Sequence, residues 1–267
     1  MRALFVAAAL AALALPCNAD GMRLAPQRGQ TITQTDLLGY LFVAPQRGDW
    51  LRYRVSADDK TILTKTIGFG VERFGDSDSA FFETETQSPG LTGSPVEAHS
   101  IVGGTLVWKM FVDTQNFNDS EHLYTFVAGI IKIGDALFRL GDGPGMPLSP
   151  AYHERLQSLL LYGTLMLPDD RQGTVSASTP QDVEVDGKTV HTVHTTVDFA
   201  AQSIGMAAGV PAARIETWQT TDVPLGIVTI RSTTNGHAYS VDLQAYGRGS
   251  FRSVITQPFE TIRYFPG

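Results

Sequence analysis

Two histidines three residues apart, His191 and His194, have the spacing of a pair of metal ligands. On a helix this spacing would place both imidazole rings on one face. The residues around them, Lys188 to Val197, follow an Asp-Gly pair and are rich in Val and Thr, which is typical of a strand in a hairpin. Side chains three apart on a strand point to opposite faces. We therefore expect the two rings to share no metal ion.

The local motifs of the common exported hydrolases and metalloenzymes do not occur in the sequence. It contains no GxSxG, SxxK, HExxH, Walker A or CxxC pattern. A Ser-His-Asp triad can assemble from distant residues, so a hydrolase without a local motif stays open as an alternative. The interpretation that we favour is a protein with no catalytic residue, no metal and no cofactor.

The elements that must position any functional residues are mostly short strands. Apolar and polar residues alternate from Asp49 to Ser56, as expected for a strand with one buried face. Asp186-Gly187 and Asn235-Gly236 each separate two such runs and favour the type I′ turn of a hairpin. The predicted strands are 49–56, 61–74, 79–87, 105–113, 122–128, 183–185, 188–197, 214–221, 227–233, 237–246 and 250–256.

Helical patterns are few. Ser149 and Pro150 suit the start of a helix that runs to Leu160. A second short helix is predicted over Asp36 to Phe42. The segment from Phe199 to Ala213 is predicted to be either a short helix or a mobile apolar loop. We expect one mainly β domain over residues 20–267, with a partly helical insertion around residues 134–167.

Apolar residues gather in two connections where polar residues are expected. Residues 199–210 carry no charge, and residues 159–167 read Leu-Leu-Leu-Tyr-Gly-Thr-Leu-Met-Leu. Ordinary core packing is one interpretation. The other is a cavity for an apolar ligand, because methionine adapts its shape to varied ligands. The residues predicted to line it are Trp108, Leu160, Met166, Phe199, Met206 and Trp218.

The first nineteen residues have the pattern of a bacterial signal peptide. Met1 and Arg2 precede an apolar run from Ala3 to Leu15, and small residues at 17 and 19 suit cleavage after Ala19. The run is shorter than the about twenty residues that a spanning helix needs, and no later stretch approaches that length. We expect a periplasmic or secreted protein with no transmembrane segment. Lipidation of Cys17 is disfavoured because Leu15 and Pro16 precede it.

Composition and charge exclude other classes of protein. Of the 267 residues, 43% are hydrophobic and 18% are charged, which is typical of a globular chain. The net charge of −7 argues against nucleic-acid binding, which needs a basic surface.

Two segments carry a resemblance to a known family. Glu216 to Val228 contains a Trp-bearing strand that turns through Val-Pro-Leu-Gly into the next strand, and 243–247 closes the hairpin that follows. Together with Gly48 to Tyr53, they resemble strands of the periplasmic lipoprotein-carrier and LolB-like half-barrel superfamily. The resemblance implies a strongly curved antiparallel sheet, a half-barrel, with a few short covering helices around an apolar cavity. No segment matches the family motif that carries its lid-locking arginine.

The function expected from these features is to bind or carry a lipid or other amphiphilic ligand on the concave face of the sheet. Burial of one acyl chain contributes several kcal/mol, at about 25 cal/mol per Å² of apolar area. The main alternative is a non-enzymatic module of the cell envelope that binds another protein. An outer-membrane barrel is disfavoured by the helix predicted after Ser149 and by Pro266 in the last residues, where a terminal strand needs a backbone donor.

Overall fold

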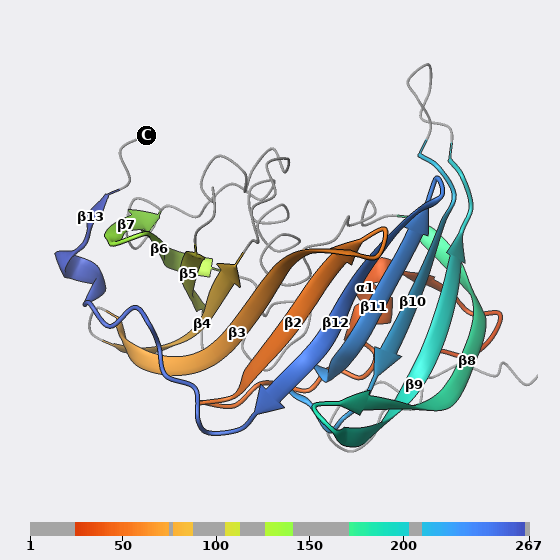
Figure 1. The fold of residues 1–267 in the computed structure, drawn as a ribbon, viewed down its shortest axis with the longest axis horizontal. Helices are drawn as coiled ribbons and strands as arrows, with labels where there is room; N and C mark the ends of the chain where they lie inside the picture. Colours follow the sequence, from red (N-terminus) through yellow and green to blue (C-terminus); the bar gives the residue numbers. More distant parts are fainter. Residues whose placement is uncertain are drawn as a thin grey trace, which may run out of the picture.

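Strands dominate the computed structural model of the protein (Figure 1). It describes residues 25–74, 77–87, 105–112, 126–140, 171–202 and 210–264. In chain order the elements are β1 (Thr31–Thr33), α1 (Gln34–Gly39), β2 (Trp50–Ala57), β3 (Lys60–Phe74), β4 (Ser77–Gln87), β5 (Thr105–Val112), β6 (Phe126–Ile133), β7 (Ala136–Leu140), β8 (Gln172–Val185), β9 (Lys188–Phe199), β10 (Ala213–Gln219), η2 (Pro224–Gly226), β11 (Ile227–Thr234), β12 (His237–Gly247), η3 (Phe259–Thr261) and β13 (Arg263–Tyr264).

Within the described ranges, the strands form one sheet in the order β1-β8-β9-β10-β11-β12-β2-β3-β4-β5-β6-β7-β13. Neighbouring strands are antiparallel, except that β13 runs parallel to β7. The sheet is open and strongly curved, and α1 lies on its inner side behind β10 and β11 (Figure 1). The fold class predicted from the sequence is therefore confirmed. No helix in the described ranges is long and apolar enough to cross a membrane.

In the described parts of the chain, three tight turns with two residues at positive φ connect neighbouring strands. Asp186-Gly187 and Asn235-Gly236 join β8 to β9 and β11 to β12, as predicted. Asp58 and Asp59 form the third turn, between β2 and β3, with φ values of 46° and 65°. Aspartate tolerates this left-handed region better than most residues, so the Asp-Asp pair can form the same kind of turn as Asp-Gly.

Two strand predictions are wrong in extent. β8 begins at Gln172, whereas the sequence predicted only 183–185. The first part of β8 has no strand pattern in the sequence, because its residues are small or polar and include Pro180. β1 pairs with only residues 172–174 of β8, so the edge at Pro180 is open and the missing N–H of proline removes no hydrogen bond there. β6 covers Phe126–Ile133 rather than 122–128, and residues 122–125 lie outside the described ranges.

The short helix predicted over Asp36 to Phe42 is present as α1, but it begins two residues earlier and ends three residues earlier, because Thr33 caps it and forms a capping box with Asp36. The helix predicted from Ser149 lies outside the described residues, as do 141–167 of the predicted insertion. Of the segment 199–213, Phe199 ends β9, Gln202 and Val210 form an antiparallel bridge, and 203–209 lie outside the described residues.

Alternation along β2 defines the two faces of the sheet. Leu51, Tyr53 and Val55 are buried, whereas Arg52 and Arg54 are exposed. We call the face that carries Leu51, Tyr53 and Val55 the inner face and the opposite one the outer face. Most of the main apolar cluster lies on the inner face, where Leu37 and Leu38 of α1 join it.

The tip of the β8–β9 hairpin reaches toward β12. Lys188, at the start of β9, places its Nζ atom 5.9 Å from the ring centroid of Tyr246 on β12. Val185 of β8 is buried, and Val183 packs against the main apolar cluster. The strand register places both valines on the same face of the hairpin as His194.

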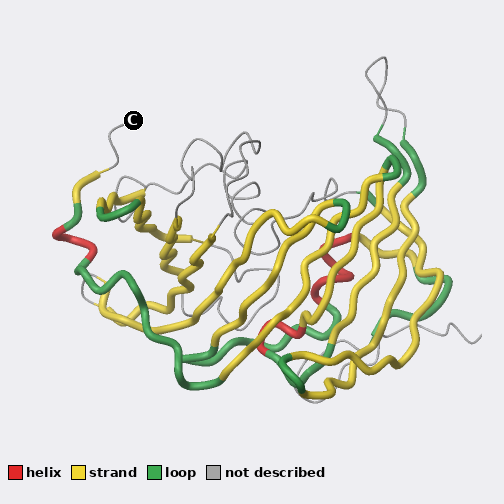
Figure 2. The backbone as a smooth tube through the Cα atoms, in the orientation of Figure 1, coloured by secondary structure: helices red, strands yellow, loops and turns green. Residues whose placement is uncertain are grey.

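The segment 250–256, predicted as a strand, instead crosses the outer face without pairing. We call residues 249–262 the C-terminal strap; it leaves the end of β12 and runs toward β13 (Figure 2). Phe251, Ile255, Phe259 and Ile262 pack from it onto the outer side chains of β4 to β6. The strap thus covers the outer face of β4 to β6.

Candidate functional site

The inner face of β3, β4 and β5 presents two rows of side chains that are buried, except for the half-buried Trp108. The strand register aligns Ile67, Thr84 and Trp108 in one row. It aligns Lys65, Thr86 and Leu106 in the next. Trp108 packs against the main inner cluster and also against the smaller cluster of Leu106 and Ile131. These rows are the candidate functional site.

Three buried polar side chains distinguish this lining from an ordinary core. Lys65 is 1% exposed, Thr86 is 2% exposed, and Thr84 is fully buried. Within the described ranges, the Thr84 hydroxyl has no hydrogen-bond partner. Buried polar groups are rare without a structural or functional reason, because their desolvation is unfavourable. The lining therefore combines apolar area with polar groups, as a surface for an amphiphile does.

Two predicted lining residues, Trp108 and Phe199, lie on the inner face. Trp108 is half-buried in the candidate site, and Phe199 is buried in the main inner cluster near the end of β9. Leu160, Met166 and Met206 lie outside the described residues. The structure thus places two of the six on the inner face, and Trp218 is a third that belongs to the main cluster.

Trp218 lies on the outer face, contrary to the expectation that it shares a space with Trp108. The inward residues of β10 are Ile215, Thr217 and Gln219, so Trp218 points the other way. It is buried there because the His194 ring stacks on it, with centroids 4.1 Å apart, and the Arg231 guanidinium lies 5.1 Å from its centroid.

The two histidines of the HxxH pattern have separate partners. His194 Nε2 lies 3.2 Å from Glu216 Oε1, whereas His191 Nδ1 lies 2.7 Å from Asp182 Oδ1 on an exposed part of the β8–β9 hairpin. The hydrogen bond to Asp182 raises the pKa of His191. Within the described ranges, no group of three His, Cys, Asp or Glu side chains is placed to hold a metal ion.

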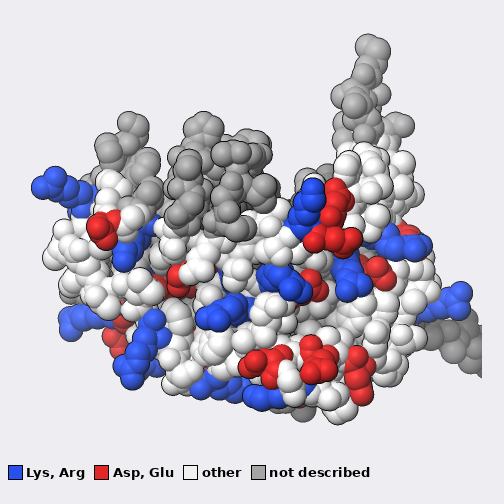
Figure 3. Space-filling view, in the orientation of Figure 1, with Lys and Arg blue, Asp and Glu red and all other residues white. Residues whose placement is uncertain are grey.

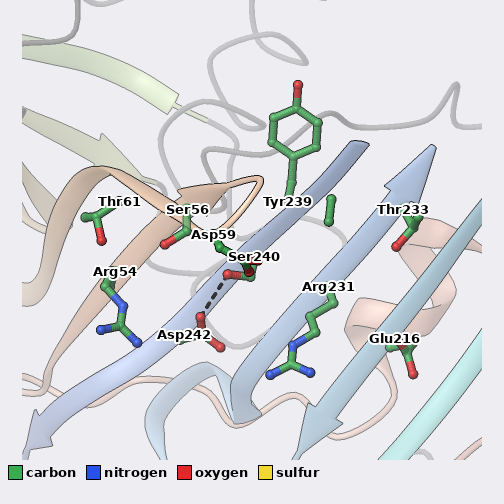
Figure 4. Close-up of a pocket in the computed structure, with 11 residues that line it drawn as sticks. Arg54, Ser56, Asp59, Thr61, Glu216, Arg231, Thr233, Tyr239, Ser240 and Asp242 are labelled. Atoms are coloured by element: carbon green, nitrogen blue, oxygen red, sulfur yellow. Dashed lines mark hydrogen bonds between the residues drawn. The ribbon is translucent and has the colours of Figure 1, made fainter. Parts of the chain in front are cut away.

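A shallow polar hollow of about 550 Å³ lies on the outer face (Figure 4). Asp242 faces Arg54 across β12 and β2, and Glu216 faces Arg231 across β10 and β11. Tyr239 points away from these charged side chains (Figure 4). Opposite charges on neighbouring strands stabilise a sheet, and Figure 3 shows basic and acidic residues interspersed over this face. We interpret the hollow as part of a solvated surface.

Sequence reasoning missed three buried cations, Lys65, Lys109 and Arg171. Lys65 lies in the candidate site, Lys109 lies under the C-terminal strap, and Arg171 precedes β8. Each of these cations lies in or beside a strand, where the alternation of apolar and polar residues predicts only which side chains share a face. Burial of a cation depends on contacts far along the chain, so no local signal marks it.

No family model matches the chain, and comparison with curated proteins finds no match. Among solved structures, the chain is similar to the hypothetical protein CT021 from Chlamydia trachomatis, determined at 2.0 Å resolution. The two share 10% sequence identity over 86% of this chain and 100% of that chain, with a TM-score of 0.39.

Proposed function

We propose that this protein is an exported carrier or sensor that binds a lipid or another amphiphile on the inner face of its curved sheet. The observation that carries the proposal is the inner face of β3 to β5, where Trp108 and its apolar neighbours lie beside Lys65 and Thr84. The proposed location rests on the predicted signal peptide and is the periplasm.

The energetics of such binding require no catalytic group. Each buried methylene contributes about 0.8 kcal/mol, so about ten of them contribute about 8 kcal/mol before the entropic cost of association. A net value of about 8 kcal/mol corresponds to micromolar affinity, so after the cost of association is subtracted one such chain binds more weakly than that, and a longer chain or a headgroup contact strengthens the complex.

The described residues favour this proposal over the protein-interaction module. Beyond the short β1, one edge of β8 has no partner strand within the described ranges. Pro180 and a bulge between Val175 and Ala177 interrupt this edge. Both features discourage the addition of a strand from a partner. The outer face carries mixed charge rather than an apolar patch.

The first experiment is extraction and mass spectrometry of the protein purified from its own cells. We expect an amphiphile to be present in a stoichiometric amount. A protein free of lipid that also fails to bind the neutral fluorophore N-phenyl-1-naphthylamine would contradict the proposal. N-terminal sequencing of the same sample tests export, since cleavage after Ala19 predicts Asp20 as the first residue.

Trp108→Ala and Trp218→Ala form a matched pair for the same fluorophore. Both remove an indole from a strand, but Trp108 faces inward and Trp218 outward. We expect Trp108→Ala to weaken binding at least about tenfold, since loss of a large aromatic contact costs about 1.5 kcal/mol or more. Equal effects of the two substitutions would refute the placement of the site on the inner face.

A further inference from the structure

Arg171 lies directly before β8 on the inner face of the sheet. Its side chain is 1% exposed. Its guanidinium carbon lies 5.7 Å from the ring centroid of Phe199. Gly173, two residues later, faces the same ring, because a Cβ atom there would come within 2.8 Å of it. Arg171 therefore borders the main apolar cluster rather than solvent.

One nitrogen of Arg171 has a structural role. Nη2 donates hydrogen bonds to the carbonyl oxygens of Ala200, at 2.8 Å, and of Pro211. A longer contact of 3.4 Å reaches the Phe199 oxygen. These bonds hold together the end of β9 and the residues that lead into β10.

The other two nitrogens of Arg171 have no such role. Nε and Nη1 are buried and have no hydrogen-bond partner, and no carboxylate of the described ranges forms an ion pair with the guanidinium. Backbone carbonyls need only N–H donors, which a neutral side chain could supply. The net charge and the free donors of Arg171 are therefore unexplained by the structural role.

A buried charge without a counter-ion is strongly unfavourable. Desolvation by burial lowers the pKa of Arg171, but arginine keeps its proton at neutral pH in proteins. An anion that is part of a ligand would supply both the missing charge and acceptors for the free N–H groups. Guanidinium suits a carboxylate or a phosphate in particular, because its donors lie in one plane and point in several directions.

We propose that Arg171 binds the anionic headgroup, a carboxylate or a phosphate monoester, of the amphiphile whose chain lies on the inner face. This inference rests on the proposed function. Phe199, next to the guanidinium, belongs to the same continuous apolar cluster as Phe82 on β4 and Met110 on β5. The guanidinium therefore lies beside an apolar cluster that extends to the strands of the candidate site.

The test uses the full chain loaded with N-phenyl-1-naphthylamine and three competitors of equal length, dodecanoate, dodecyl phosphate and dodecanol. We expect at least one of the two anions to displace the fluorophore at a concentration at least about tenfold below that of dodecanol. Arg171→Gln keeps amide N–H donors for the backbone carbonyls but removes the charge. It should abolish the advantage of the anion and leave displacement by dodecanol unchanged.

Arg214→Gln is the matched control. Arg214 lies at the same end of the sheet, on β10, but is exposed and paired with Asp198 at 2.7 Å. Its substitution should leave the ratio of anion to alcohol unchanged. If thermal melting shows that Arg171→Gln does not fold, Arg171→Lys replaces it, because it keeps the charge and loses the planar donors. We expect a reduced but measurable advantage of the anion in that variant.

The possible outcomes separate the two proposals. Equal displacement by all three competitors in the unmodified protein would overturn the role of Arg171 and leave amphiphile binding intact. A protein that binds neither the fluorophore nor any of the competitors would overturn the proposed function itself. A preference for the carboxylate or for the phosphate supports the inference and identifies the headgroup.

Discussion

The substitution Lys109→Met tests how the C-terminal strap is held on the outer face. Lys109 is fully buried. Its Nζ atom donates to the Ile255 oxygen at 2.8 Å and to Ser253 Oγ at 3.1 Å, and it forms an ion pair with Glu72. Glu83 is 2% exposed and accepts the N–H of Val254 at 2.7 Å. The strap is therefore held by a buried network of opposite charges.

Removal of the cation leaves Glu72, whose side chain is 31% exposed, without its ion-pair partner, and takes a positive charge away from the buried Glu83. Breaking a fully buried ion pair costs about 3–5 kcal/mol, and the part-exposed partner places the expected loss at the lower end of this range. Methionine is close in length to lysine, so packing against the Phe81 ring, 4.1 Å from Nζ, is largely kept. Domains of this kind are stable by about 5–15 kcal/mol, so Lys109→Met should remove a large part of the free energy of unfolding.

The assay is equilibrium unfolding in urea, followed by circular dichroism, on four proteins. These are the unmodified chain, Lys109→Met, Glu83→Gln and the double variant. We expect the single lysine variant to lose about 3 kcal/mol or more. The double variant should be more stable than the sum of the single effects predicts, by at least about 1 kcal/mol, because it removes the uncompensated charge.

The control is Arg252→Met, an exposed cation on the same strap. We expect it to change the free energy of unfolding by less than about 0.5 kcal/mol. A loss below about 1 kcal/mol for Lys109→Met, or additive effects in the double variant, would refute the reasoning. The strap would then be held by its apolar side chains alone.

Three further predictions concern single residues. Burial raises the pKa of Glu83 above its ordinary value of 4.5. The folded state therefore keeps this proton to higher pH than the unfolded state. The contribution of Glu83 to stability is thus fullest below pH 4.5 and is lost as the pH rises through the folded pKa. Urea unfolding across this range should show this decrease in the free energy of unfolding for the unmodified chain, and Glu83→Gln should lack the part that comes from Glu83. Gly68→Ala places a Cβ atom 2.0 Å from the Phe251 ring, so we expect a loss of about 1–3 kcal/mol, measured by thermal melting; a loss that persists undiminished in a Phe251→Ala background would show that this contact is not its cause. Thr84→Val removes a buried hydroxyl without a partner in the described ranges and should leave stability equal or higher; a clear decrease in the urea midpoint would show that the hydroxyl is bonded in solution.

The sequence predicts a strand well where one face is buried and the other solvated. The alternation on β2, with Leu51, Tyr53 and Val55 inward, is visible without the structure because solvent contrasts with core. β5 gives no such contrast. Its inner residue Trp108 and its outer residue Phe111 both meet apolar neighbours, because the strap covers the outer side. Sequence reasoning therefore placed Trp108 and Trp218 in one space, whereas the register sets them on opposite faces.

What the sequence alone determined is the fold class and the hairpins, because alternation and turn residues act over a few neighbouring positions. What only the tertiary structure decided is which face each side chain occupies and which charges are buried. Lys109 meets Ile255 across 146 residues of chain, and Arg171 meets Pro211 across 40. Burial of those two cations is a property of contacts between distant segments, which no local pattern encodes.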